Sequence, residues 1–174
     1  MPALDSVYRF ACQLTRDPSD AEDLVQDTYL RAFQNRHRYE LGTNCTAWLF
    51  TICRNLWLQN RQRESRITPY ADTELDDLAG PRGQWPATGS LASVFDLPEF
   101  DDVLQRALES IPENYRTPVV LIDAEDNTYA TTAAILGVPI GTVRSRLFRG
   151  RRLLQGKLLA YAEDAGLVSA SVEP

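Results

Sequence analysis

The sequence predicts an all-α protein made of two small helical domains joined by a flexible acidic linker. Apolar residues recur at helical spacing over residues 5–66, and this stretch holds a single glycine. Residues 67–97 lose that spacing and are rich in proline, glycine and acidic side chains, which is typical of a linker. Helical spacing resumes near residue 98. We therefore expect a first domain at 1–66, a linker at 67–97, a second domain at 98–163 and a tail at 164–174.

Length and composition limit the class of protein. The 174 residues are enough for two small domains, and 44% hydrophobic residues are enough for packed cores. No apolar run approaches the roughly 18 residues that cross a bilayer. The start, Met1 to Asp5, lacks the basic stretch and apolar core of a signal peptide. We expect a soluble cytoplasmic protein without a membrane partner.

The thiols predict neither a disulfide framework nor a metal site. Cys12, Cys45 and Cys53 are odd in number and widely spaced, and His37 is the sole histidine. Four such residues have the ligand count of a zinc site but lack its paired spacing. We interpret the cysteines as reduced packing residues, and expect no metal and no cofactor.

An acidic amphipathic helix follows the turn at Asp17-Pro18, and we expect it to begin near Ser19 or Asp20. Its predicted buried stripe consists of Ala21, Leu24, Val25, Thr28 and Ala32. The opposite side carries an acidic ridge made of Asp20, Asp23, Gln26 and Asp27. Such a ridge is usually solvated surface with pairs such as Asp27 to Arg31, and partner binding is the alternative.

A loop and an aromatic helix come next. Gly42-Thr43-Asn44 interrupts the helical pattern, and a strongly apolar helix follows at residues 47–58 and leads into a basic run. Tryptophans here are more often core than stacking platforms. A polar loop with aromatic residues and trailing arginines is nevertheless what capture of unstacked single-stranded bases requires.

The second domain contains a predicted helix-turn-helix. Residues 129–136 form a short helix, Gly137 ends it, residues 138–140 turn, and a basic helix begins at Gly141. At about 100° per residue, one face of this second helix is apolar and packs. It holds Val143, Leu147, Gly150 and Leu154, while the opposite face holds Arg144, Ser145, Phe148, Arg149, Arg151 and Arg152.

The exposed face has the chemistry of base readout. Arginine pairs with guanine, serine reaches base edges, and an aromatic ring lies against a thymine methyl group. Phe148 among arginines favours a DNA partner over a merely solvated face, and Thr142 at the helix start suits a phosphate. Residues 127–162 carry six positive charges and no acidic residue. Because the net charge of the whole chain is −6, the remaining residues together carry a charge of −12. Such a chain binds DNA at one segment and is repelled elsewhere.

Three stretches in order resemble the extracytoplasmic-function (ECF) sigma factors, the smallest class of bacterial sigma factors. The first is Asp20-Ala21-Glu22-Asp23-Leu24-Val25-Gln26-Asp27-Thr28. The second is Gly42-Thr43-Asn44 with Ala47-Trp48-Leu49-Phe50-Thr51-Ile52. The third runs from Leu136 to Arg151 and contains the basic helix. The resemblance covers nearly the whole chain apart from the linker and the tail.

The resemblance implies a role for each domain. The first would be sigma region two, docking on the clamp helices of the largest subunit of core RNA polymerase through Asp20, Asp23, Gln26, Asp27 and Arg31. Residues 39–46 would capture a flipped base of melted minus-ten DNA, the contacts being Tyr39, Asn44, Trp48, Arg54, Arg61 and Arg63. The second would be region four, which reads duplex minus-thirty-five DNA through Thr142, Arg144, Ser145, Arg146, Phe148, Arg149 and Arg152.

The resemblance also implies further partners. Region four would meet the polymerase beta flap, the linker would thread through the polymerase channels, and an anti-sigma factor would occlude the binding surfaces. Two departures stand out. Thr131 and Thr132 replace the Glu and Ile that the family commonly has, so we expect weaker packing there. Cys45 and Thr46 replace aromatic or basic loop residues.

The sequence leaves two other classes of function as alternatives. A stand-alone helix-turn-helix regulator would need a dimerisation surface and a palindromic site. An enzyme has little support, because the chain has one histidine, no nucleophile motif and no phosphate-binding glycine loop. Transcription initiation without catalysis is therefore the function that the sequence predicts.

Overall fold

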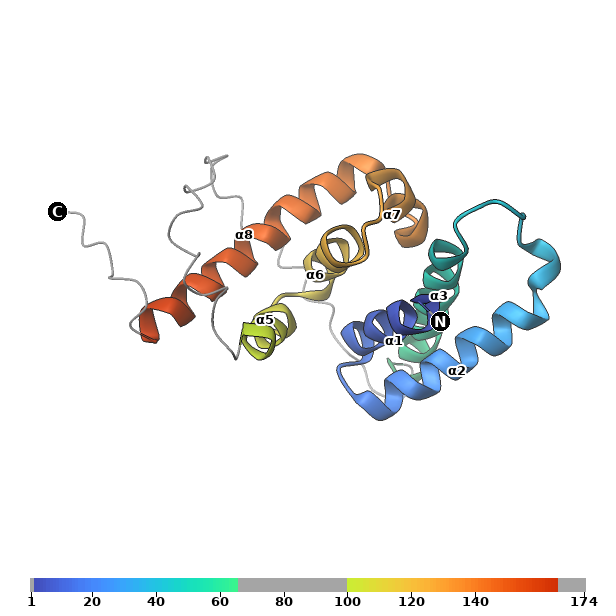
Figure 1. Cartoon of the computed structure of the whole chain (residues 1–174), viewed down its shortest axis with the longest axis horizontal. Helices are drawn as coiled ribbons and strands as arrows, with labels where there is room; N and C mark the ends of the chain where they lie inside the picture. The colour runs from blue at the N-terminus through green and yellow to red at the C-terminus, as the bar shows by residue number, and fades with distance from the viewer. Residues whose placement is uncertain (1, 66–99, 166–174) are drawn as a thin grey trace.

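The computed structural model describes residues 2–65 and 100–165, and every regular element in these ranges is a helix. The all-α prediction is confirmed. The predicted linker at 67–97 and nearly all of the tail lie outside the described residues. None of the described helices is both long and apolar enough to cross a membrane. In chain order the elements (Figure 1) are α1 (Pro2–Thr15), α2 (Pro18–Gln34), η1 (Arg36–Arg38), α3 (Cys45–Ser65), α5 (Phe100–Glu109), α6 (Glu113–Val119), η3 (Val120–Ala124), α7 (Tyr129–Leu136) and α8 (Ile140–Asp164).

Helices α1, α2 and α3 pack together as the first domain. Arg16 has a positive φ of 62° and turns the chain between α1 and α2. The Asp17 carboxylate then accepts hydrogen bonds from the backbone N–H groups of Ser19 and Asp20, at 2.8 and 3.1 Å. With this cap in place, α2 begins at Pro18, slightly earlier than the sequence predicts, because proline suits the first helical position.

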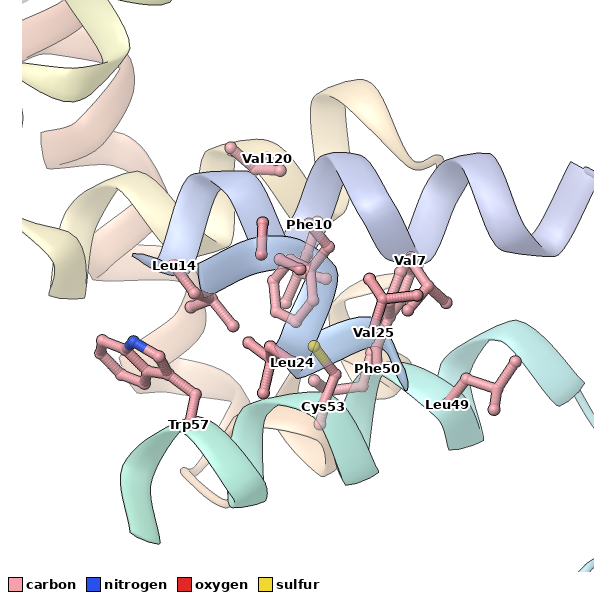
Figure 2. Close-up of a cluster of buried hydrophobic side chains, with 14 of the residues drawn as sticks. Val7, Phe10, Leu14, Leu24, Val25, Leu49, Phe50, Cys53, Trp57 and Val120 are labelled. Carbon is pink, nitrogen blue, oxygen red and sulfur yellow. The ribbon is translucent and has the colours of Figure 1, made fainter. Parts of the chain in front are cut away.

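The core of the first domain is formed by residues from all three helices (Figure 2). The rings of Phe10 in α1 and Phe50 in α3 lie 4.9 Å apart between centroids, and both side chains are fully buried. Leu24 of α2 and Cys53 of α3 fill the space around them. Contacts between residues far apart in the sequence therefore determine how α2 is presented to solvent.

In the second domain, α6 packs against the long helix α8. Pro118 lies inside α6 and lacks the N–H that would bond to the carbonyl four residues earlier, and the helix widens into the single π turn η3 directly afterwards. Gly150 of α8 lies against this segment. A Cβ atom there would be 2.4 Å from the Tyr115 carbonyl oxygen and 2.7 Å from Val119 Cγ2. The absence of a side chain at Gly150 is what permits this close helix approach.

The two domains are in contact, which the sequence did not predict. Val120 and Leu121 of η3, Ile135 of α7 and Val143 of α8 belong to the same buried cluster as Phe10. Figure 2 shows Val120 beside Phe10 of the first domain. The polar edge of this contact holds a hydrogen bond from Gln13 to Gln105, at 2.8 Å, and an ion pair between Arg9 and Glu125, at 2.9 Å. The domains thus share one apolar core across their boundary.

We predict that Gly150→Ala destabilises the protein by about 1–3 kcal/mol, because the added methyl group overlaps backbone atoms of α6. Gly156→Ala is the matched control. It lies in the same helix with nothing within 4 Å of a Cβ, and alanine should stabilise the helix there by about 0.5–1 kcal/mol. Urea denaturation of both variants measures the difference. Equal stability of the two variants would show that the close approach is not required.

Candidate polymerase and nucleic-acid interfaces

The acidic ridge of α2 faces solvent. The buried residues of this helix are Ala21, Leu24, Val25, Thr28 and Ala32, as the sequence predicts. With that face packed, the side chains of Asp20, Asp23, Gln26, Asp27 and Arg31 are all exposed on the other side. Within the described residues no ion pair engages Asp27 or Arg31, so the pair expected for a purely solvated face does not form. The ridge is a continuous surface of carboxylates with an amide.

Sequence reasoning missed two apolar residues on this surface. Leu30 is 57% exposed and Phe33 is 66% exposed, on the turns that follow Asp27. At 100° per residue Leu30 lies directly opposite the centre of the buried stripe, so a helical projection of the sequence contains the signal. Arg36 lies over the Phe33 ring, 4.6 Å from its centroid. An apolar centre with a charged rim is the composition of a protein-binding surface.

The loop between η1 and α3 is held by its own side chains. The Tyr39 hydroxyl donates to the Thr43 carbonyl at 2.6 Å, and the Tyr39 ring lies 5.2 Å from the Trp48 ring. Gly42 has a φ of 93°, a left-handed conformation that favours glycine. Leu41 is 94% exposed beside it. Tyr39 and Trp48 are only partly buried, so an aromatic pair borders an open loop.

Asn44 has a local structural function in addition to its predicted DNA contact. Its side-chain oxygen accepts a hydrogen bond from the backbone N–H of Ala47 at 3.1 Å, which is the geometry of a helix N-cap. It therefore fixes where α3 begins relative to the loop. The side chain remains at the exposed surface.

The basic residues of α3 are placed differently from one another. Arg63 is exposed, whereas Arg54 is half-buried. Arg61 lies over the ring of Trp57, 4.8 Å from its centroid, and its guanidinium donates to the Glu113 carboxylate of the second domain at 2.8 Å. Trp57 itself is buried in the core. Arg61, one of the three predicted backbone contacts, therefore joins the other domain.

The helix-turn-helix has the geometry that the sequence predicts. The Thr128 hydroxyl caps α7 by accepting from the N–H of Thr131 at 3.1 Å, and Gly137 ends the helix in the left-handed conformation, with a φ of 64°. After Val138 and Pro139, α8 begins at Ile140, one residue earlier than expected. The two helices pack against each other.

The predicted faces of α8 are largely confirmed. Val143, Leu147 and Gly150 are buried, and Leu154 is partly buried against a small second cluster. The exposed residues include Phe148, at 40% exposure, with Arg144, Ser145 and Arg152. Thr142, Arg146 and Arg149 are partly buried. An exposed aromatic ring with arginines on one helix face is what base readout requires.

Two arginines of that face contact residues of the second domain. The Arg149 guanidinium donates to the Tyr115 hydroxyl of α6 at 3.3 Å. Arg151 was grouped with the DNA face, and the structure corrects this. Its Nε donates to Oδ2 of the Asp123 carboxylate at 3.0 Å, and its Nη2 donates to Oδ1 of the same group. Because Asp123 lies 28 residues earlier, helix spacing alone does not reveal this pair.

Thr131 and Thr132, which depart from the common family pattern at the start of α7, lie in different environments. Thr131 joins the N-cap, because its hydroxyl lies 2.9 Å from that of Thr128. Thr132 is fully buried, and its hydroxyl has no hydrogen-bond partner among residues 2–65 and 100–165. An unpaired hydroxyl in an apolar site costs free energy, and the weaker packing expected there stays a prediction.

The three thiols differ in environment. Cys53 packs in the core, where burial raises its pKa to about 12, so it stays protonated and unreactive. Cys12 is partly buried, but Cys45 is exposed at the first turn of α3, which corrects its interpretation as a packing residue. Within the described ranges no group of three or more metal-binding side chains comes together.

Comparison with known proteins identifies both domains. Residues 3–67 match the family model of Sigma-70 region 2, and residues 101–154 match that of Sigma-70 region 4. The ECF sigma factor EcfG of Rhodopseudomonas palustris is 35% identical over 168 residues, which cover 95% of this chain and 87% of EcfG. The chain belongs to the ECF RNA polymerase sigma factor family. Its general function is therefore promoter-directed transcription initiation with RNA polymerase, and a stand-alone regulator is not favoured.

Other members are similar in sequence and in fold. SigE of Mycolicibacterium smegmatis is 37% identical over 160 residues, which cover 92% of this chain and 60% of the length of SigE. The sigma factor RpoE of Bartonella quintana, solved in complex with the anti-sigma factor NepR, is 32% identical with a TM-score of 0.69. That superposition covers 90% of this ECF chain and 92% of RpoE. CnrH, at 21% identity and a TM-score of 0.59, shares the fold.

We predict that Thr132→Val stabilises this sigma factor by about 1 kcal/mol, because it removes a buried hydroxyl that has no partner. Thr28→Val is the matched control. Its hydroxyl is equally buried but donates to the Leu24 carbonyl at 2.7 Å, so that exchange should not stabilise. Thermal unfolding followed by circular dichroism compares the two. Stabilisation of similar size in both variants would contradict an unpaired hydroxyl at Thr132.

Proposed function

We propose that this ECF sigma factor joins core RNA polymerase through α2 and reads promoter DNA with two surfaces. The 39–46 loop and α3 bind the melted minus-ten element, and α8 binds the duplex minus-thirty-five element. The observation that carries the proposal is the presence of both sigma domains in one chain, each exposing a face of suitable charge. The acidic ridge serves a protein partner, because carboxylates are repelled by DNA phosphates.

The docking surface on α2 combines charge with apolar contact. Asp20, Asp23, Gln26, Asp27 and Arg31 provide polar contacts with the clamp helices of the largest polymerase subunit. Leu30 and Phe33 add the apolar area that anchors a protein interface. Because the buried stripe fixes the orientation of α2 on the domain, the surface needs no rearrangement before docking.

The minus-ten surface uses the loop and the first turns of α3. The exposed backbone around Leu41 and Gly42 admits an unstacked base, and Tyr39 with Trp48 provides an aromatic surface beneath it. Asn44 acts at the rim of this surface. Arg54, Arg61 and Arg63 extend the contact along the DNA backbone.

The minus-thirty-five surface is the exposed face of α8. Ser145, Phe148 and Arg149 read bases in the major groove, while Thr142, Arg144, Arg146 and Arg152 contact phosphates or base edges. The second domain also meets the polymerase beta flap. An anti-sigma factor that covers these surfaces is the further partner, in keeping with the RpoE complex with NepR. The protein acts in the bacterial cytoplasm and carries out no catalysis of its own.

Run-off transcription with purified bacterial core polymerase on fragmented genomic DNA tests the proposed function. We expect discrete transcripts that require both the core enzyme and this chain, and their start points would define the promoter. If the chain does not associate with core polymerase, or associates and yields no transcript from any fragment, the proposal is wrong.

Asp27→Ala and Phe33→Ala should each weaken binding to core polymerase on every template by about 1–3 kcal/mol, because both truncate the docking surface. The control is Asp5→Ala, which removes one exposed carboxylate from α1 of the same domain. Competition against a labelled sigma factor measures the affinity. Loss that depends on the template would assign these residues to DNA instead of the polymerase.

Arg149→Ala should cost about 1–3 kcal/mol at one base position of the minus-thirty-five element and relax specificity there. Arg151→Ala is the control, because its guanidinium already pairs with Asp123. Transcription from promoter variants carrying each base change gives the specificity profile. Uniform loss across all sequences for the Arg149 change would make it a phosphate contact.

A further inference from the structure

Glu113 lies where the two domains meet and is surrounded by arginines. It occupies the first turn of α6, and its carboxylate accepts a hydrogen bond from Arg61 of α3 at 2.8 Å. Burial raises the pKa of Glu113, and the positive charges of Arg61, Arg116 and Arg54 act in the opposite direction. A single carboxylate of the second domain thus faces two arginines of the proposed minus-ten surface.

The two proposed DNA surfaces also approach each other here. Burial lowers the pKa of Arg54, while the Glu113 carboxylate raises it and the positive charge of Arg146 in α8 lowers it further. Arg54 belongs to the minus-ten surface and Arg146 to the minus-thirty-five surface. Helix α3 packs directly against α7, the first helix of the helix-turn-helix. The Glu113 carboxylate offsets part of the repulsion between these arginines.

Burial of Arg116 makes the contact between the two domains less favourable in free energy. Its side chain is 1% exposed, and one terminal nitrogen donates to the Gln13 carbonyl of α1 at 2.6 Å. The other two guanidinium nitrogens have no hydrogen-bond partner in the described part of the chain. Burial lowers the pKa of Arg116 to about 10. A buried cation with two unpaired donors costs free energy and therefore opposes closure of the domains.

We propose that the free chain has a closed state in which Glu113 occupies, on Arg54 and Arg61, the place of a DNA phosphate. This inference rests on the proposed function, because it takes these arginines as contacts with the minus-ten DNA backbone. A carboxylate and a phosphate offer guanidinium groups the same charge and the same acceptor oxygens. DNA must therefore displace Glu113 before it reaches this part of α3.

Promoter geometry requires the closed state to open. The minus-ten and minus-thirty-five elements are about 25 base pairs apart, or about 85 Å at 3.4 Å per base pair. Domains that share a buried cluster cannot lie on both elements at once. Separation of the domains on the polymerase releases Arg61 from Glu113 and exposes the half-buried Arg54 and the buried Arg116. One rearrangement thus frees this part of α3 and lets the two domains reach both elements.

The test measures binding of a short fluorescein-labelled single strand of mixed sequence to the full-length protein without polymerase, by fluorescence anisotropy. Backbone contacts do not depend on base sequence, so the promoter need not be known. Glu113→Gln should tighten binding about two- to fivefold, because it removes the competing carboxylate. Asp101→Asn is the control, since it removes one exposed carboxylate from α5 of the same domain.

A second variant opens the contact without changing charge. Gln105→Ala removes the acceptor for Gln13 across the domain boundary, and it should tighten binding in the same direction. Equal tightening by Glu113→Gln and Asp101→Asn would reduce the effect to net charge and overturn the inference. No tightening by either interface variant would overturn it as well.

Run-off transcription by the wild-type chain, measured in parallel, separates the two proposals. If transcription starts normally and the interface variants bind the strand no better than wild type, the closed state alone is wrong. If the interface variants bind better but the wild-type chain starts no transcript, the proposed function is wrong.

Discussion

The packing of α6, η3 and α7 against α1 and α3 determines which surfaces the protein presents. This contact joins Val120 and Leu121 to the core around Phe10 and Phe50, so the two sigma domains are not independent bodies in this structure. It leaves α2 and most of α8 open to solvent. It also brings the basic end of α3 against the second domain. Docking on the polymerase is thus compatible with the closed arrangement, whereas engagement of both promoter elements is not.

Charge explains why such an arrangement is useful. Most of the chain is acidic and is repelled by DNA, whereas every charged side chain in residues 127–162 is basic. In the closed arrangement Glu113 neutralises part of the cationic surface of α3. A free sigma factor of this kind avoids nonspecific DNA, and polymerase binding would bring its surfaces to the promoter at high effective concentration.

The sequence predicted features that depend on local spacing. The buried stripe of α2 agreed residue for residue, because it follows from helical periodicity alone. The bounds of α7 and the Gly137 turn also agreed, because the left-handed cap has a strong glycine signal. Leu30 and Phe33 were missed although the same projection places them on the exposed face. They are apolar, and helical periodicity by itself does not distinguish an apolar residue that packs in the core from one that meets a partner.

Features that depend on distant partners were not predictable. The pairing of Arg151 with Asp123 spans 28 positions, and that of Arg61 with Glu113 spans 52. No periodicity links such residues, so Arg151 was placed with the DNA face and the contact between the domains was not foreseen. Thr132 is intermediate: its departure from the family pattern was visible in the sequence, but only the structure shows that its hydroxyl is unpaired.

The distance between the domains is the most direct test of the idea that polymerase binding converts a closed chain into an open one. Spin labels at Cys45 in the first domain and at an Ala160→Cys substitution in α8, with Cys12 replaced by serine, report it in the full-length protein. Both labelled positions are exposed, and Cys53 is buried with a pKa of about 12. A single narrow distance distribution in the free chain, shifted to longer distances with core polymerase, is the expected result. The same distance distribution in both states would contradict it.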